Sequence, residues 1–232
     1  MKTIGLIGGM SWESTITYYK IINEEVQKRL GGSHSGKILL HSFDFEDIAV
    51  LQRAAKWEEA NSVLIEAGRG LVRAGADFLL ICTNTMHLCA CAVEKELKVP
   101  LLHIADPLGE AIRRAGVARV ALLGSLFTME MPDVVRGRLK SKYDLDLLTP
   151  QGAEAREVHR IIFDELVRGR FLEASRARLR DIIAGLVENG AEGVVLGCTE
   201  LPLLVMEEDC PVPLFDTTAL HAMAAVDFAL RE

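Results

Sequence analysis

The chain has 232 residues, of which 50% are hydrophobic and 25% charged, and its formal net charge is −7 at pH 7. These apolar side chains suffice for a packed core, whereas the negative charge argues against general binding to nucleic acids or anionic membranes. The chain lacks an apolar run of about 18 residues, so we expect no membrane span, and its apolar N-terminal stretch is too short for a secretory signal. Five cysteines, an odd number, without such a signal indicate a reducing, cytoplasmic setting rather than a disulfide framework.

Short runs rich in Val, Ile and Leu alternate with amphipathic segments along the whole chain. We expect strands near residues 3–8, 37–43, 77–82, 100–104, 119–124, 145–148, 193–197 and 212–215. Most are apolar at nearly every position, as is typical of parallel strands that are buried on both faces. Helical patterns occupy residues 13–30, 57–74, 107–115, 154–168 and 172–189. This alternation predicts an α/β fold built from βαβ units.

Four short segments recur in the same order in the second half of the chain, which indicates two copies of one α/β unit. Two of them are displaced by 116 residues. The pairs are TIGLIG (3–8) with RVALLG (119–124), LVRAGAD (71–77) with LVENGAE (186–192), FLLICT (78–83) with VVLGCT (194–199), and VPLL (99–102) with VPLF (212–215).

Cys82 and Cys198 occupy matching places in the two repeats, and Thr follows each of them. Catalytic groups in open α/β sheets gather at the carboxyl ends of strands, so facing lobes would put one thiol on each side of a shared cleft. We expect a helix N-terminus to lower the pKa of such a thiol and to make it a base at neutral pH. The pair could then remove a proton from one face of a carbon and return one to the other. An inert, buried cysteine at each position is the alternative.

The other cysteines and the histidines show no pattern of a redox or metal site. The chain has no Cys-x-x-Cys motif, and Cys89 and Cys91 would point in different directions on a helix. Together with His87 they lack the second ligand pair that zinc needs. We therefore expect structural or solvent-facing roles for His87, His103, His159 and His221.

Residues 80–87 (LICTNTMH) and 195–201 (VLGCTEL) resemble the two cysteine signatures of the aspartate/glutamate racemase family. Residues 7–14 (IGGMSWES) look like the start of its aspartate racemase branch, and the resemblance covers essentially the whole chain. It implies two pseudo-symmetric Rossmann-like lobes, with parallel sheets flanked by helices and the active site in the inter-lobe cleft. The lobes would comprise residues 1–99 plus 212–232, and residues 100–211. The Glu after the second Cys-Thr favours this branch over the cell-wall glutamate racemases, which usually carry His there.

The resemblance implies a racemase that interconverts L- and D-aspartate, glutamate or a related polar amino acid, with Cys82 and Cys198 as the paired acid and base. It also implies catalysis without pyridoxal phosphate or metal, a homodimer, and no nucleic-acid or membrane partner. Two alternatives stay open. One is a related enzyme that uses the same cysteines for maleate isomerisation, decarboxylation or hydantoin racemisation. The other is a non-catalytic bilobed protein that binds a small molecule.

Eight further residues are candidates for binding the substrate. N-cap-type residues after each cysteine could present backbone N–H groups to an α-carboxylate, and Glu200 could accept the substrate ammonium. The resemblance places a distal-carboxylate contact near Gln52 or Arg53, and Arg suits such a contact. Thr83 could orient the first thiol or relay a proton, although capping alone would also explain it. The candidates are Met10, Gln52, Arg53, Thr83, Asn84, Thr85, Thr199 and Glu200.

Overall fold

The structure is a computed structural model, and it describes residues 1–131 and 134–231. In these residues eight strands form two parallel four-stranded sheets, with the orders β2-β1-β3-β4 and β6-β5-β7-β8. The strands are β1 (Ile4–Gly8), β2 (Ile38–Ser42), β3 (Phe78–Ile81), β4 (Leu101–Leu102), β5 (Arg119–Gly124), β6 (Asp146–Leu148), β7 (Gly193–Gly197) and β8 (Leu214–Asp216). The predicted α/β class, with parallel sheets flanked by helices, is confirmed.

The α-helices in the described part of the chain are α1 (Trp12–Leu30), α2 (Phe45–Arg53), α3 (Trp57–Arg73), α4 (Ala90–Leu97), α5 (Ala105–Arg114), α6 (Leu126–Glu130), α7 (Arg136–Tyr143), α8 (Gly152–Arg160), α9 (Glu173–Glu188) and α10 (Thr217–Leu230). The helix expected over residues 154–168 is not continuous. α8 is followed by a π-helical turn (Ile161–Glu165) and a 3₁₀ turn (Leu166–Arg168). Among the described residues, no helix combines the length and apolar character that a membrane crossing requires.

The chain divides into two compact units, one of residues Met1–Ile104 with His221–Glu232 and the other of Ala105–Leu220. These boundaries differ from the expected 99/100 and 211/212. β4 stays in the first sheet because its residues pair with β3, and β8 stays in the second because its residues pair with β7. Because of this strand pairing, the chain passes between the two units after Ile104 and after Leu220, later than expected in both cases.

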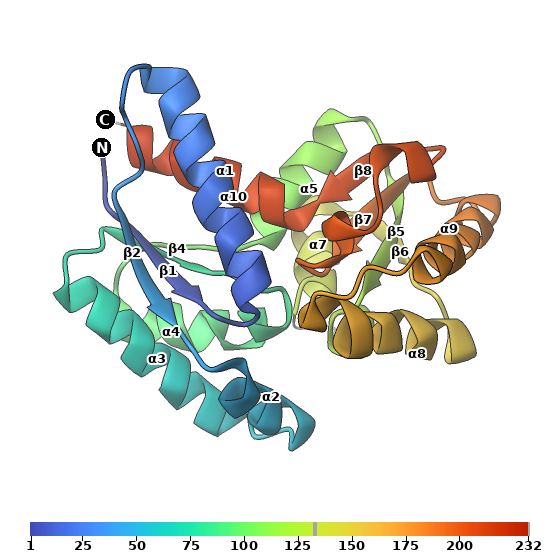
Figure 1. Cartoon of the computed structure of the whole chain (residues 1–232), viewed down its shortest axis with the longest axis horizontal. Coiled ribbons are helices and arrows are strands. Elements are labelled where there is room, and N and C mark those ends of the chain that lie inside the picture. Colours follow the sequence, from blue (N-terminus) through green and yellow to red (C-terminus); the bar gives the residue numbers. More distant parts are fainter. Residues whose placement is uncertain (132–133, 232) are drawn as a thin grey trace. The chain divides into compact units, whose positions relative to one another are not determined.

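Two cores lie on opposite faces of the first sheet because successive side chains of a strand point to opposite sides. Leu6 and Leu80 pack on the face covered by α1 and α10. Ile7 and Ile81 pack on the other face, with α3 and α4. Figure 1 shows these two helix pairs on either side of β1 and β2. Burial on both faces explains why these strands are apolar at consecutive positions.

The second sheet follows the same rule. Leu123 and Leu196 pack with α8 and α9 on one face. α5 and α7 pack against each other and contact β8 and β6, respectively (Figure 1). The contact between α5 and α7 is close, because a side chain at Gly109 would collide with the ring of Tyr143.

The loop after β1 turns sharply into α1. Gly9 has a φ of +80°, and a Cβ there would collide with the backbone of Phe43, so the position requires glycine. The Gly9 N–H donates to Thr15 Oγ1 at 2.8 Å. Ser11 then caps α1 by accepting a hydrogen bond from the Ser14 N–H at 3.3 Å. These contacts fix the direction in which the chain leaves the strand.

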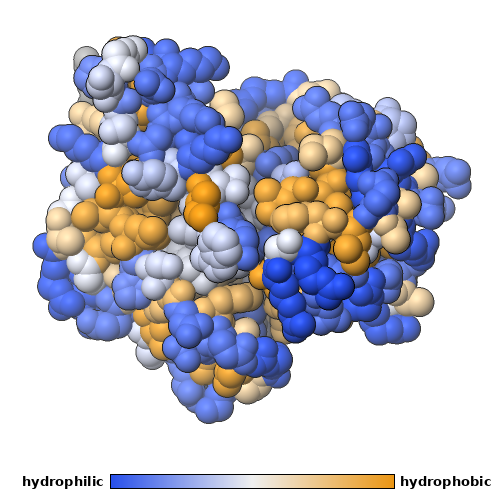
Figure 2. Space-filling view, viewed as in Figure 1, coloured by the Kyte–Doolittle hydropathy of each residue, from blue (hydrophilic) through white to orange (hydrophobic). Residues whose placement is uncertain are grey.

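The outer face of α1 carries an apolar stripe. Trp12, Ile16 and Tyr19 are 60%, 55% and 55% exposed and lie about one helical turn apart. Figure 2 shows that hydrophilic residues cover much of the visible surface, with apolar patches between them. The α1 stripe is therefore apolar surface that the chain leaves uncovered.

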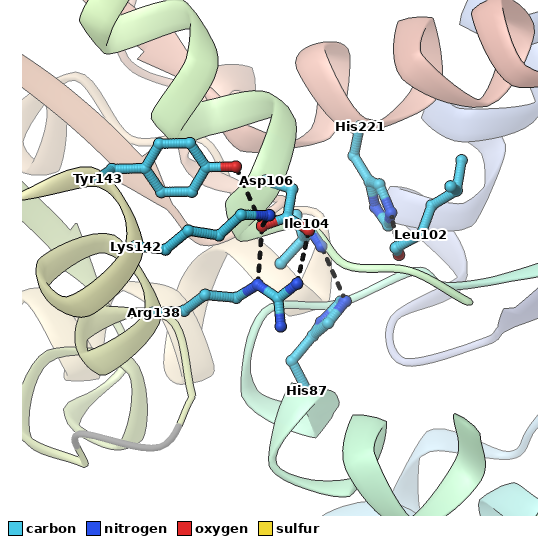
Figure 3. Close-up of polar contacts among 8 residues, drawn as sticks. All are labelled: His87, Leu102, Ile104, Asp106, Arg138, Lys142, Tyr143 and His221. Atoms are coloured by element: carbon cyan, nitrogen blue, oxygen red, sulfur yellow. Dashed lines mark hydrogen bonds and ion pairs between the residues drawn. The ribbon is translucent and has the colours of Figure 1, made fainter. Parts of the chain in front are cut away.

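Asp106 holds the first turn of α5 to α7. Its carboxylate accepts hydrogen bonds from the Arg138 guanidinium at 2.7 and 2.6 Å, from Lys142 at 3.0 Å and from the Tyr143 hydroxyl at 3.1 Å (Figure 3). Burial alone would raise the pKa of this carboxyl. Hydrogen bonds and charges from Arg138 and Lys142 outweigh burial and lower the pKa to about 2. The ionised carboxylate is thus stabilised in the folded chain.

We expect Asp106→Asn to lower the free energy of unfolding at pH 7 by about 1–2 kcal/mol. The pKa of Asp106 is lower in the folded chain than in the unfolded chain, so its contribution is complete well above pH 4 and is lost as the pH falls toward 2. Urea unfolding of wild type and variant at pH 7, 5 and 3 measures this effect. Glu46→Gln, which removes an exposed ion pair with Arg53, is the control and should change stability by less than about 0.5 kcal/mol. A difference for Asp106→Asn that stays constant between pH 7 and 3 would contradict the assignment.

Candidate active site

Polar residues follow β3 at its carboxyl end. Cys82 is fully buried, Thr83 is 9% exposed, and Asn84 and Thr85 are buried. Thr85 begins a short 3₁₀ turn, η1 (Thr85–Cys89), which leads into α4. Four of the predicted site residues therefore lie in one continuous turn of the first unit.

The pairing of strands shows which residues of the two repeats correspond. Ile4 of β1 lies beside Phe78 of β3, and Val120 of β5 lies beside Gly193 of β7. Ile4 and Val120 hold the same place in the repeated TIGLIG and RVALLG segments. Phe78 therefore corresponds to Gly193, and the displacement between β3 and β7 is 115 residues rather than 116.

This register changes the expected match between the two cysteines. Cys82 corresponds to Gly197, and Thr83 corresponds to Cys198. The expectation that the thiols occupy equivalent positions is wrong by one residue, because the Cys-Thr letters match whereas the hydrogen-bonded backbones do not. A Cβ on Gly197 would lie 2.9 Å from the Leu123 carbonyl oxygen, so the counterpart of Cys82 has no room for a side chain.

Packing of the two cysteines agrees with this register. Cys82 belongs to the core shared with α1 and α10, as Leu80 does two residues earlier. Cys198 is half-buried and packs against the core formed with α8 and α9, which Leu196 also joins. Ile81 and Leu196 hold corresponding places in the two sheets. Cys82 and Cys198 therefore lie on non-equivalent faces of their own sheets.

Cys198 forms a cluster with the two residues after it at the carboxyl end of β7. Its thiol donates to Glu200 Oε2 at 3.0 Å, and the Thr199 hydroxyl donates to the same oxygen at 2.9 Å. Thr199 and Glu200 are both buried. The second unit thus places a thiol, a hydroxyl and a buried carboxylate in direct contact.

Both thiols have a raised pKa, contrary to the lowering expected from helix N-termini. Burial raises the pKa of Cys82. Burial also raises the pKa of Cys198, the charge and hydrogen bond of Glu200 raise it further, and backbone N–H groups of Thr199 and Glu200 oppose these effects. The expected α-helices do not begin at either position. Cys198 is followed by a 3₁₀ turn, η4 (Leu201–Leu203), and Cys82 by η1, and both turns are too short for a substantial helix dipole.

Gln52 and Arg53 point to different surroundings although they are neighbours on α2. Gln52 is buried, and its Nε2 lies 3.1 Å from Met86 Sδ in η1. Met10 is buried in the same core as Met86. Arg53 is exposed and forms an ion pair with Glu46. The structure therefore brings Gln52, but not Arg53, to the segment that follows β3.

The loop after β5 contains polar residues that the sequence patterns do not single out. Ser125 caps α6 by accepting a hydrogen bond from the Thr128 N–H at 3.2 Å. The Leu126 N–H donates to Nδ1 of His159 at 3.2 Å. Burial lowers the pKa of His159, which favours its neutral form. The repeat of Gly8 at Gly124 is the signal that could have placed this loop at the carboxyl edge of the second sheet.

Comparison with known proteins assigns the chain to a family. The model of the Asp/Glu/Hydantoin racemase family matches residues 7–225. The chain belongs to this family. The resemblance carried by the two cysteine signatures is thereby confirmed.

Solved structures of related proteins share the whole fold of this family member. A protein from Yersinia pestis assigned to the Asp/Glu racemases is 47% identical, with a TM-score of 0.92 and full coverage of both chains. An aspartate racemase homologue from Pyrococcus horikoshii OT3 is 35% identical, with a TM-score of 0.85 and full coverage of both chains. The broad specificity amino-acid racemase RacX of Bacillus subtilis (strain 168) is 20% identical over 96% of each chain.

The structure describes no metal-binding cluster among its residues: no group of three or more His, Cys, Asp or Glu side chains is arranged to hold an ion in residues 1–131 and 134–231.

We expect Glu200→Gln to make Cys198 more reactive, because the carboxylate charge contributes to the raised pKa of the thiol. At pH 8, alkylation of Cys198 by iodoacetamide should become at least about threefold faster, which corresponds to a pKa lower by about half a unit. Peptide mass spectrometry measures the rate. Burial raises the pKa of Cys210 to about 11, and this cysteine is the internal reference. A rate at Cys198 that is unchanged or slower relative to Cys210 would contradict the electrostatic role of Glu200.

Proposed function

We propose that the chain is an amino-acid racemase that interconverts the L- and D-forms of aspartate, of glutamate or of a related polar amino acid, without pyridoxal phosphate or metal. The observation that carries the proposal is the contact between Cys198 and Glu200 at 3.0 Å, at the carboxyl end of β7, in a member of a racemase family. The thiolate of Cys198 can remove a proton from a carbon acid, and Glu200 can either accept the thiol proton or, as the carboxylate, attract a substrate ammonium. The names of the family and of the related proteins support aspartate and glutamate as substrates.

The proposed reaction moves one proton at Cα. Cys198 as thiolate removes the proton, and the electron pair of the broken C–H bond remains on Cα, delocalised into the α-carboxyl group. A second group on the opposite face of Cα then donates a proton to that electron pair, which inverts the stereocentre. A substrate ammonium beside Glu200 would favour the thiolate form of Cys198, because a nearby positive charge lowers the pKa of a thiol.

The second acid–base group is either Cys82 or Thr83. Thr83 is favoured because the strand register makes it the counterpart of Cys198, whereas Cys82 packs into the core with α1 and α10. A hydroxyl is protonated at neutral pH, so Thr83 would donate its proton to the carbanion more readily than it would remove one from substrate, and the alkoxide left behind would regain a proton from solvent. In that case Cys82 supports the position of Thr83 by packing.

The remaining predicted residues would hold the substrate. Asn84, Thr85 and Thr199 supply polar groups near the ends of β3 and β7 that could bind the α-carboxylate. Gln52 is better placed than Arg53 to contact a distal carboxylate, because its amide already reaches η1. Arg53 would first have to leave its ion pair with Glu46. Met10 would supply apolar contact.

We also propose that the racemase is a cytoplasmic homodimer. The exposed stripe of Trp12, Ile16 and Tyr19 is apolar surface whose burial would favour association. Sedimentation equilibrium on the purified chain distinguishes a dimer from a monomer.

A panel of single enantiomers tests the function. We expect the purified chain to racemise aspartate, glutamate or a related polar amino acid, with no loss of activity after exhaustive dialysis and chelation. Chiral chromatography measures the products, and incorporation of solvent deuterium at Cα reports the proton transfer. The panel includes hydantoins, arylmalonates and maleate. Turnover of these compounds alone would identify a related isomerase or decarboxylase, and binding without turnover would identify a binding protein.

Substitutions at three positions test the division of roles. Cys198→Ala should lower kcat at least about 10³-fold, because it removes an acid–base group. Thr83→Val keeps the shape but removes the hydroxyl, and we expect a loss of at least about 10²-fold. Cys82→Ala should retain kcat within about fivefold, with a lower melting temperature from the loss of a buried side chain. The reverse result, with Cys82→Ala inactive and Thr83→Val active, would make Cys82 the second acid–base group.

A further inference from the structure

Two buried histidines form hydrogen bonds near the points where the chain passes from one compact unit to the other. His87 lies in η1, where Ile104, the last residue before the chain enters the second unit, donates its N–H to His87 Nε2 at 3.1 Å. His221 is the first residue after the chain returns, and its Nε2 lies 2.8 Å from the Leu102 carbonyl oxygen. Figure 3 shows the two imidazoles on either side of this short segment. His221 therefore binds the last residue of β4, and His87 binds the segment just after it.

Hydrogen-bond partners assign the tautomer of each ring. His87 Nε2 accepts a backbone N–H, so its proton is on Nδ1, which donates to the Thr83 carbonyl oxygen at 2.8 Å. His221 Nε2 faces a carbonyl oxygen and carries the proton, and its Nδ1 accepts from the Tyr18 hydroxyl at 2.8 Å. His87 is thus held neutral in one tautomer, and that tautomer binds two segments of backbone at once.

The contact of His87 with Thr83 bears on the candidate site. Thr83 follows β3, where the ladder of hydrogen bonds between strands ends, so its peptide plane is not fixed by the sheet. His87 supplies the missing restraint by donating to the Thr83 carbonyl and by receiving the N–H of Ile104. The orientation of that carbonyl sets the direction of the side chains on either side of it.

We propose that His87 is a positioning residue that aligns Thr83 for proton transfer and ties it to Ile104, in the segment after β4 from which the chain leaves the first unit. This inference rests on the proposed racemase function. It holds for either candidate acid–base group, because Cys82 and Thr83 share the peptide that precedes the restrained carbonyl. His221 contacts β4 and Tyr18, and its ring lies edge-on to that of His87 with centroids 5.7 Å apart, so it bears on the alignment indirectly, through this ring contact.

Two amide substitutions separate the two hydrogen bonds of His87. The amide nitrogen of Asn lies near the place of Nδ1 and can still donate to the Thr83 carbonyl, whereas the amide oxygen of Gln lies near the place of Nε2 and can still accept from Ile104. We expect His87→Asn to keep kcat within about threefold of wild type. We expect His87→Gln to lower kcat at least about tenfold with KM changed less than about threefold, because a misplaced catalytic group loses rate rather than binding.

His221→Gln is the matched control in the same buried cluster, and its amide N–H can still donate to Leu102. It should keep kcat within about twofold even if the melting temperature falls. Equal losses of kcat in His87→Asn and His87→Gln, or losses in all three variants that follow the fall in melting temperature, would overturn the proposal.

A measurement that needs no activity separates this inference from the proposed function. Long-range ¹H–¹⁵N correlation spectra of the wild-type chain report the tautomer of each histidine. We expect the proton of His87 on Nδ1 and that of His221 on Nε2. A proton on Nε2 of His87 would overturn the proposal even in an active racemase. Failure of the wild-type chain to racemise any amino acid, with the expected tautomers present, would overturn the proposed function instead.

Discussion

Parallel pairing of β1 with β3, and of β5 with β7, is the constraint on which the other features depend. Each pair fixes which side chain points to which face of the sheet and which residue first leaves the sheet at its carboxyl end. The apolar cores follow from this alternation, because Leu6 and Leu80 pack on one face while Ile7 and Ile81 pack on the other. The positions of Thr83 and Cys198 follow from the same pairing. Each residue comes directly after the last residue that is hydrogen-bonded to the neighbouring strand.

The two thiols differ in electrostatics because Cys82 packs into an apolar core whereas Cys198 contacts a carboxylate. Cys82 lies among aliphatic side chains, so burial alone raises its pKa. Cys198 contacts a buried carboxylate, which adds a negative charge to the effect of burial. A cationic substrate group can offset the effect of the Glu200 charge on the pKa of Cys198. It has less influence on the pKa of Cys82, which burial alone raises. The two thiols are therefore chemically unequal before any substrate binds.

Much of the fold could be predicted from the sequence, since the eight strands are nearly continuous apolar runs bounded by Gly, Pro or charged residues. The residues of the candidate site could be predicted only to within one position along the chain. The repeated Cys-Thr letters suggest that Cys82 matches Cys198, whereas the backbone register makes Thr83 the counterpart of Cys198 and Gly197 the counterpart of Cys82. Adjacent Gln52 and Arg53 could not be told apart, because their burial depends on how α2 packs. The role proposed for His87 depends on contacts with Thr83 and Ile104 that no local pattern contains.

The correspondence of Thr83 with Cys198 in the two repeats has a thermodynamic consequence for the proposed racemase. Enantiomers have equal free energies in water, so the ratio kcat/KM must be the same for the two directions of a racemisation whatever groups the enzyme uses. If the two acid–base groups are a thiol and a hydroxyl, as proposed, the values of kcat in the two directions are free to differ. Any difference in kcat is then matched by an equal factor in KM. A difference between the two repeats at this one position would then let the chain have a lower KM for one enantiomer. The equilibrium between the two enantiomers would not change.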